Sequence, residues 1–314
     1  MNIHALDHTA ILCPLTEYGL IRFSGEDSLS FLQGQLSSDI RSLQPETAQY
    51  SSYSTAKGRM LASFLVWRHG DDYLLQVSAD ILPAIQKRLS MFILRSKTKA
   101  SDAGTDPALF GIAGPQAAEK IRTALGIEIA PPMSIQAGEH FHLLTLGNER
   151  FELLIEQAHT ESIIQRLTEA GCVAADAAIW RLAEIRAGIA WITQPTQEAF
   201  VAQMANLDLT GAVSFNKGCY TGQEIIARTQ YLGKLKRRMY RARLSAETVS
   251  AGQAVFSAEM QGQASGQIVL SAPLAEGQWE VLVIAQMSSL EHGLHLASPE
   301  GPILEILNLP YEIE

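Results

Sequence analysis

The same order of predicted elements occurs twice in this chain, and this repetition limits the folds it can adopt. Four strand-like segments are expected at 60–67, 73–78, 140–146 and 150–156. Each pair flanks a turn of polar and glycine residues, and a helix follows each pair, from Asp80 and from Thr160. The inner face of the first helix is predicted to carry Ile81, Ile85, Leu89 and Phe92. The repetition predicts two related α+β lobes, each a hairpin covered by a helix.

The 314 residues exceed the roughly 250 that one hydrophobic core usually serves, so several domains are expected. Further helices are predicted from Gly114 to Gly126 and from Asp176 to Ala187. After about Lys236 the pattern changes to short alternating segments separated by Gly, Ser and Pro, which is typical of a small β-barrel or sandwich. The predicted domains are a first α+β lobe over 1–105, a second over 106–235 and a β-barrel over 236–314.

Composition and charge restrict the class of protein. Three scattered cysteines do not form a secreted disulfide framework, and no apolar run approaches the ~18 residues of a membrane span, so we expect a cytoplasmic protein. The net charge of -9 is uneven, because the segment 217–243 holds eight bases and one acid, a local charge of 8 - 1 = +7. This basic segment indicates either an anion site or a solvated strand face.

The segment 216–224, "NKGCYTGQE", places Cys219 just before a predicted helix. Thr221 and Glu224 have the spacing of a capping box, which predicts Thr221 as the N-cap and Gly222 as the first helical residue. Free backbone N–H groups, the helix dipole and Lys217 would then favour the thiolate of Cys219. The alternative is that this cysteine is a small buried hydrophobe, which is the usual situation of a free cysteine.

The run "NLDLTGAVSFNKGCYTGQEIIARTQYLG", residues 206–233, closely resembles the motif of the folate-binding YgfZ family, which is related to the glycine-cleavage T-protein, an aminomethyltransferase. Other stretches that agree are "FSGEDSLSFLQGQLSSDI" from Phe23, "KGRM" from Lys57, "GIAGPQA" from Gly111, Phe200 to Gln203, and "LPY" from Leu309. The resemblance therefore extends over nearly the whole chain.

The resemblance implies an α+β fold in which two intertwined lobes and a C-terminal β-barrel form a ring around a central cavity for tetrahydrofolate or a derivative, including polyglutamylated forms. It also implies a role in the maintenance or assembly of iron–sulfur enzymes and, through them, in tRNA modification. The expected partners are iron–sulfur proteins or their assembly factors. Contact with tRNA is expected to be indirect, and the chain is expected to act as a monomer.

The resemblance also implies which residues form the site. Cys219 is the functional thiol, and Lys217 lies beside it in the motif. The expected folate-binding residues are Tyr18, Trp180, Gln203, Tyr220, Gln223, Glu224 and Arg228. A pterin ring requires aromatic stacking and hydrogen-bonding groups at its edge, which suits the two aromatic residues Tyr18 and Trp180, although large rings are more often packed in a core.

Two positions depart from T-protein-like sequences. Where those sequences tend to have a glutamate that can bind the pterin, this chain has Arg186, which carries only donors. Where they have an aspartate that handles protons near the substrate amine, this chain has Ala62 and Ser63, neither of which is a general base near neutral pH. Aminomethyl transfer is therefore disfavoured, and a folate-dependent one-carbon transferase or demethylase acting on a small amine is the alternative function.

The basic segment has two candidate ligands. Arg and Lys side chains suit the carboxylates of a folate polyglutamate tail. RNA phosphate is the competing ligand, but no aromatic residues alternate with the bases over 232–238, so direct tRNA binding is the weaker interpretation.

No metal site is predicted. His140 and His142 would share one side of a strand, but no third ligand lies near them in the sequence, so an ordinary strand face is expected. Three scattered cysteines cannot supply the four thiolates of an iron–sulfur cluster, so no stably bound metal or cluster is expected. Cys219 could still ligate a cluster transiently with a partner or a second copy.

Overall fold

The computed structural model describes residues 5–104 and 106–313, and it has an α+β fold with a closed C-terminal β-barrel. The chain divides into two compact units, each assembled from three segments. The first unit comprises the residues up to Ser28, Ser42–Gln49 and Leu65–Ala183. The second comprises Leu29–Arg41, Tyr50–Phe64 and the residues from Glu184 onward. This division is by compactness, and the three domain boundaries expected from the sequence stay a prediction.

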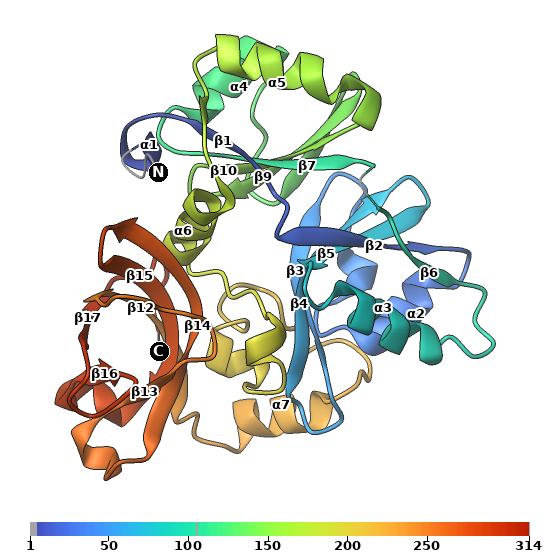
Figure 1. The fold of residues 1–314 in the computed structure, drawn as a ribbon. Coiled ribbons are helices and arrows are strands. Elements are labelled where there is room, and N and C mark those ends of the chain that lie inside the picture. The colour runs from blue at the N-terminus through green and yellow to red at the C-terminus, as the bar shows by residue number, and fades with distance from the viewer. Residues whose placement is uncertain (1–4, 105, 314) are drawn as a thin grey trace. The chain divides into compact units, whose positions relative to one another are not determined.

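A six-stranded sheet forms one part of the first unit (Figure 1). Its strands, in spatial order, are β11 (Val173–Ala174), β1 (Ile11–Pro14), β7 (Ala108–Ala113), β10 (Arg150–Ile155), β9 (Phe141–Gly147) and β8 (Ser134–Gly138). Helices α4 (Ala117–Leu125) and α5 (Thr160–Glu169) cover one face of this sheet. Buried side chains from the sheet and from both helices, including Leu143, Ile121 and Leu167, form its core. A short helix, α1 (Ala5–His8), precedes β1.

A five-stranded sheet has the order β3 (Ala48–Ser54), β4 (Met60–His69), β5 (Asp72–Ser78), β2 (Tyr18–Ser24) and β6 (Lys99–Asp102). Strands β3 and β4 contribute residues to both compact units. Helix α3 (Leu82–Met91) packs against β2 and β6. Helix α2 (Ser28–Gln35) follows β2.

The barrel belongs to the second unit and is closed, in the order β12-β15-β14-β13-β16-β17. Its strands are β12 (Arg237–Ser245), β13 (Ala254–Phe256), β14 (Ala264–Ala275), β15 (Gln278–Gln286), β16 (Leu294–Leu296) and β17 (Ile303–Leu307). Fully buried side chains such as Val255, Ile268 and Val283 fill its interior. Pairing of β12 with β17 closes the barrel, so each of its strands has a neighbour on both sides, which is the physical advantage of this architecture.

The predicted repeat is confirmed, because β4 and β5 are followed by α3 and β9 and β10 are followed by α5. The helix predicted to end at Gly126 is α4, and Gly126 is its left-handed C-cap. The helix predicted after Asp176 is α6 (Ala177–Ala187), and the carboxylate of Asp176 accepts the N–H of Ala178 at 3.0 Å. Among the described residues, no helix has the length and apolar character needed to cross a bilayer.

One local prediction about α3 is wrong. Phe92 was expected on the inner face of this helix, but it is the C-cap and its side chain is exposed. The helix ends one residue too early to turn this ring inward, whereas Ile85 and Leu89 are buried as expected.

Candidate functional site

Cys219 lies in the loop before α7 (Gln223–Tyr231), and it is the exposed member of the three free cysteines. Cys13 and Cys172 are buried, and burial raises their pKa values to about 12 and about 11. Since the thiolate is the reactive form and reagents need access, Cys219 is the thiol of this chain that is available for chemistry. The alternative in which it is a buried hydrophobe does not apply.

The start of α7 differs from the predicted capping box. Gly222, rather than Thr221, is the N-cap, and no side chain caps the helix. Gly222 has φ = +85°, and a Cβ atom there would lie 2.5 Å from the carbonyl oxygen of Thr55. Only glycine tolerates both the left-handed conformation and this close approach, so backbone packing fixes the helix start.

Lys217 is buried, and its ammonium group contacts the backbone. Nζ donates hydrogen bonds of 2.7 Å to the carbonyl oxygens of Leu36 and Ser38, and it lies 5.0 Å from the centre of the Tyr220 ring. Burial lowers the pKa of Lys217 to about 8, and the nearby Asp39 partly opposes this shift. These contacts anchor the loop, whereas the predicted support of the Cys219 thiolate by this lysine stays a prediction.

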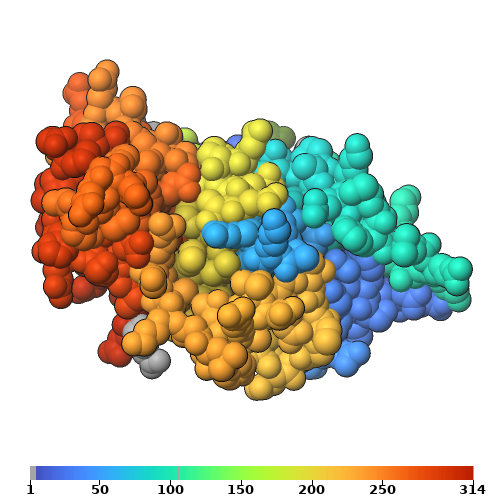
Figure 2. Space-filling model, turned by 90° about the horizontal axis from the view of Figure 1, so that it is seen from below, coloured from blue at the N-terminus to red at the C-terminus, as the bar shows by residue number. Residues whose placement is uncertain are grey.

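Several stretches that carried the family resemblance meet within the second unit. The turn of Gly58 lies against α7, because a Cβ at Gly58 would be 2.9 Å from Cβ of Ile225. The N–H of Met60 donates to the carbonyl of Phe200 at 2.8 Å. Figure 2 shows this turn, in light blue, bordered by the yellow and orange surface of the later residues. The motifs are therefore parts of one packed region, although they are far apart in the sequence.

Three predicted folate-binding residues have buried polar atoms with no hydrogen-bond partner among the described residues. These atoms are Nε1 of Trp180, Oε1 of Gln203 and the hydroxyl oxygen of Tyr220. The amide nitrogen of Gln203 donates to the carbonyl of Ile226 at 2.6 Å, so its oxygen is the part that lacks a partner. Burial raises the pKa of Tyr220 to about 12, so its hydroxyl keeps its proton at neutral pH. Such orphaned atoms are uncommon and require an explanation.

Trp180 is also packed tightly. It is only 1% exposed, and a Cβ at Gly111 would lie 2.3 Å from the ring. The indole therefore fits against the bare backbone of Gly111, as a core aromatic residue does, and its predicted stacking on a pterin stays a prediction.

The other predicted site residues lie in strand β2 and helix α7. Tyr18 is half-buried at the start of β2. Gln223 and Glu224 are the first two residues of α7, where a negative charge interacts favourably with the helix dipole. Arg228 is exposed in the last turn of the same helix.

Arg186, one of the two departures from T-protein-like sequences, contacts a barrel residue. Its guanidinium lies 3.6 Å from Glu280, whose side chain is 0% exposed. Arg241 and Arg243 contact the same carboxylate at 2.7 and 3.6 Å. Three cations thus surround one buried anion, which explains an arginine at position 186 without any ligand. Glu280 was not predicted as a site residue, although an acid at the start of the apolar run "EVLVIA" was a usable signal.

These contacts reduce the free charge of the basic segment. Arg238 pairs with Asp208 at 2.7 Å, and two further arginines pair with Glu280. Besides the buried Lys217, whose ammonium group contacts backbone carbonyls, four bases of the segment form no ion pair among the described residues, namely Arg228, Lys234, Lys236 and Arg237. About half of the basic side chains counted in the sequence are therefore available to bind a polyanion.

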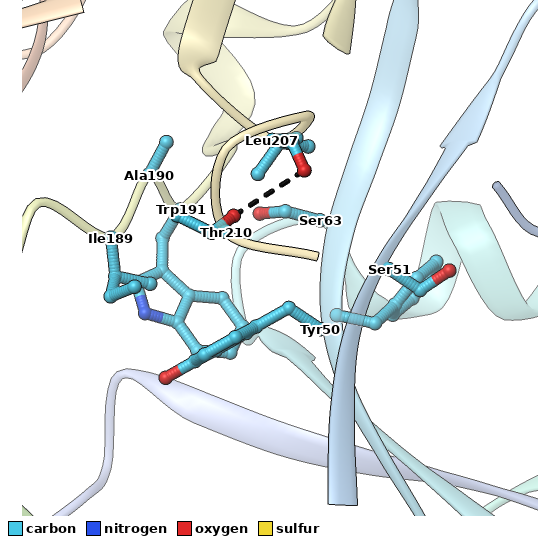
Figure 3. Close-up of a pocket in the computed structure, with 9 residues that line it drawn as sticks. Tyr50, Ser51, Ser63, Ile189, Ala190, Trp191, Leu207 and Thr210 are labelled. Carbon is cyan, nitrogen blue, oxygen red and sulfur yellow. Dashed lines mark hydrogen bonds between the residues drawn. The ribbon is translucent and has the colours of Figure 1, made fainter. Parts of the chain in front are cut away.

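The other departure lies beside a small cavity in the second unit. Ala62 is fully buried, and the hydroxyl of Ser63 accepts the N–H of Ile192 at 2.9 Å. Figure 3 shows Ser63 with Tyr50, Trp191 and other residues around a cavity of about 10 Å³. That volume suits about one water molecule and no organic ligand.

The comparisons with known proteins agree with this fold and these motifs. The structure superposes with a TM-score of 0.78 on the glycine cleavage system aminomethyltransferase T from Bartonella henselae, covering 98% of this chain and 88% of that chain at 17% sequence identity. The fold therefore places the chain in the class of proteins with the aminomethyltransferase T architecture.

Curated relatives identify the family more closely. The chain is 32% identical over 282 residues to the tRNA-modifying protein YgfZ of Edwardsiella ictaluri, covering 87% of this chain and 84% of the relative. It is 28% identical over 311 residues to the protein of the same name from Sodalis glossinidius, covering 96% and 93%. No family model matches the chain. The chain belongs to the YgfZ family.

Proposed function

We propose that this chain is a folate-binding accessory protein that acts in tRNA modification by supporting iron–sulfur enzymes, with Cys219 as its functional thiol. The tRNA part is supported by its relatives, which are named tRNA-modifying proteins. The folate and iron–sulfur parts follow from the family resemblance of the motif around Cys219. The expected partners are iron–sulfur proteins or their assembly factors.

The observation that carries the proposal is the position of Cys219 in the motif. The loop is fixed on one side by the Lys217 hydrogen bonds to Leu36 and Ser38 and on the other by the packing of Gly222 against Thr55. Between these anchors the cysteine is exposed. A chain that needed this residue only for packing would bury it, so an exposed thiol on a fixed loop supports a chemical role.

The residues present fit a folate. A pterin carries donors and acceptors at its edge, and in the second unit the orphaned atoms of Gln203 and Tyr220 offer an acceptor and a donor. Burying such atoms without partners costs about 1–3 kcal/mol each, and a polar ligand would remove that cost. We therefore assign Gln203 and Tyr220, which both belong to the second unit, to the folate site, with tetrahydrofolate or a polyglutamylated derivative as the ligand.

Calorimetry with tetrahydrofolate on the full chain tests the folate part. Replacing Tyr220 by Phe keeps the ring and removes the hydroxyl, so we expect binding of the folate by the wild type and an affinity about tenfold lower in this variant. The matched control is Tyr231→Phe, since Tyr231 is exposed. Absence of binding heat in the wild type would remove folate from the account.

Replacing Cys219 by Ala tests the thiol. In cells that lack the native protein, we expect the wild type and Cys172→Ala to restore the activity of iron–sulfur enzymes and the level of the tRNA modifications that depend on them. Cys219→Ala should restore neither. Equal restoration by both variants would exclude a functional thiol at position 219.

A folate-dependent one-carbon transferase or demethylase is the competing function. The fold is compatible with it, but Ala62 and Ser63 occupy the place of the expected acid, and Ser63 bonds to the backbone of Ile192. Without a general base near the amine, aminomethyl transfer loses a contribution of about 10²–10⁴ in rate. Formation of formaldehyde or methylene-tetrahydrofolate from small amines by the purified chain would favour this competing function.

We also propose that the contact with tRNA is indirect. Apart from the buried Lys217, only four bases of the basic segment lack ion-pair partners among the described residues, and the net charge of the chain is -9. Direct binding by many phosphate contacts would give an affinity that falls steeply with salt. A measured salt slope of several units with bare tRNA would contradict the indirect role.

A further inference from the structure

Three potential metal ligands meet at one end of the six-stranded sheet, away from the motif residues in the sequence. They are His140, Glu156 and His159, and their ligand atoms all lie within 4.8 Å of one another. Nδ1 of His140 is 2.9 Å from Oε2 of Glu156, and Nε2 of His159 is 3.9 Å from the same oxygen. All three residues belong to the first compact unit.

The backbone fixes the positions of these residues. His140 lies in the two-residue turn that joins β8 to β9, with φ = +66°. The N–H of Glu156, directly after β10, donates to the carbonyl of His140 at 3.0 Å. The N–H of His159 donates in turn to the carbonyl of Glu156 at 2.9 Å. The three side chains are therefore presented by hydrogen-bonded backbone rather than by independent loops.

The electrostatics of the cluster favour a cation. The rings of His140 and His159 are stacked, with centroids 3.5 Å apart and an angle of 3° between their planes. An imidazole ring binds a metal ion through the lone pair of a ring nitrogen. Glu156 adds a negative charge, and Oε1 of Glu139 lies 3.8 Å from Nε2 of His140. A carboxylate on the far nitrogen is a common way to orient a metal-binding histidine.

We propose that His140, Glu156 and His159 bind a divalent transition metal, with Zn²⁺ as the preferred ion. Two imidazole nitrogens and one carboxylate oxygen are a typical three-residue ligand set for zinc, which leaves a fourth position for water. Bonds of about 2.0–2.2 Å in a tetrahedron place the ligand atoms roughly 3.3–3.6 Å apart. The separations of 2.9 and 3.9 Å bracket that value, and one imidazole ring must turn out of the stack so that both lone pairs point at the ion.

This site replaces a prediction made from the sequence. His142 was considered with His140 as a strand pair, but the ring of His142 lies 5.1 Å from that of His69 instead. His140 is in the turn rather than in the strand, so the two histidines do not share a face. Glu156 and His159 supply the further ligands that the sequence did not place near His140, so the proposal departs from the expectation of no stably bound metal. The ion would link the β8–β9 turn to the start of α5.

The test is a zinc titration of the full chain carrying Cys219→Ser, because the exposed thiol of Cys219 is itself a zinc ligand. We expect one Zn²⁺ per chain by calorimetry, and visible absorption bands of tetrahedral Co²⁺ when cobalt is used as the probe. His140→Gln, Glu156→Gln and His159→Gln should each lower the zinc affinity at least about tenfold and weaken the cobalt bands.

The matched control is His142→Gln, which removes a nearby histidine that lies outside the cluster. It should bind zinc as the parent does. Circular dichroism of the metal-free variants checks that each is folded, and the ligand positions are partly or fully exposed. The proposal is overturned if the parent binds no zinc at a one-to-one ratio, if His159→Gln binds as tightly as the parent, or if His142→Gln loses as much affinity as the cluster variants.

Discussion

Gly222 and Gly58 pack directly against each other where the motif loop meets the turn between β3 and β4. A Cβ atom at Gly222 would lie 3.1 Å from the Cα of Gly58, and both residues have positive φ angles, +85° and +71°. Two segments separated by more than 160 residues thus depend on each other's lack of a side chain. The exposed Cys219 lies three residues before Gly222 in the sequence.

Replacing Gly222 by Ala should destabilise the fold. The new methyl group would lie 2.5 Å from the carbonyl oxygen of Thr55, in a backbone conformation that alanine rarely adopts. We expect the free energy of unfolding to fall by about 1–3 kcal/mol, measured by urea denaturation. Gly218→Ala in the same loop is the control, because a Cβ there meets no atom within 4 Å. If Gly218→Ala lowered the free energy of unfolding as much as Gly222→Ala does, the explanation from close packing would be contradicted.

The stability contributed at position 217 should depend on pH. Burial lowers the pKa of Lys217 to about 8, below its ordinary value of 10.5, so the unfolded chain holds the proton more tightly than the folded chain. Between these two values stability therefore rises with pH. From about pH 8 to about pH 10, the unfolding free energy of the wild type should therefore increase relative to that of Lys217→Met. Denaturation of both proteins at several pH values measures this change. A difference that stays constant or declines over this range would refute the assignment.

The three thiols should differ sharply in reactivity. Under native conditions we expect a thiol reagent to modify one cysteine per chain, since Cys219 is exposed and burial raises the pKa values of Cys13 and Cys172. In denaturant all three should react. Mass spectrometry after digestion identifies the modified residue, and rapid native labelling of Cys13 or Cys172 would be inconsistent with the buried positions.

Replacing Glu280 by Gln should leave three arginines around a neutral side chain. Arg186, Arg241 and Arg243 would then lack their shared carboxylate in the barrel wall. The three arginine side chains are partly exposed and keep some solvation without their partner, so we expect the unfolding free energy to fall by about 1–3 kcal/mol. Glu276→Gln, on the exposed turn between β14 and β15, should cost less than about 0.5 kcal/mol. An unchanged free energy of unfolding in Glu280→Gln would mean that the ion pairs of Glu280 do not stabilise the barrel.

Local patterns in the sequence predicted the elements well where the governing contacts are local. The hairpin of β9 and β10 follows from alternating apolar residues and the Asn148–Glu149 turn, and both turn residues have positive φ. The α4 C-cap at Gly126 follows from its position after an apolar helical face. The start of α7 was misplaced because Thr55, which is distant in the sequence, decides it.

The sequence by itself determined the repeated order of strands and helices, the change to a β-barrel near Arg237 and the family to which the chain belongs, because periodicity and motifs are properties of neighbouring residues. The tertiary structure decided which charges are neutralised and which remain at the surface. Arg241 meets Glu280 across 39 positions, and His140 meets Glu156 across 16. Electrostatic energy depends on distance in space, and a single sequence does not specify which distant residues become neighbours.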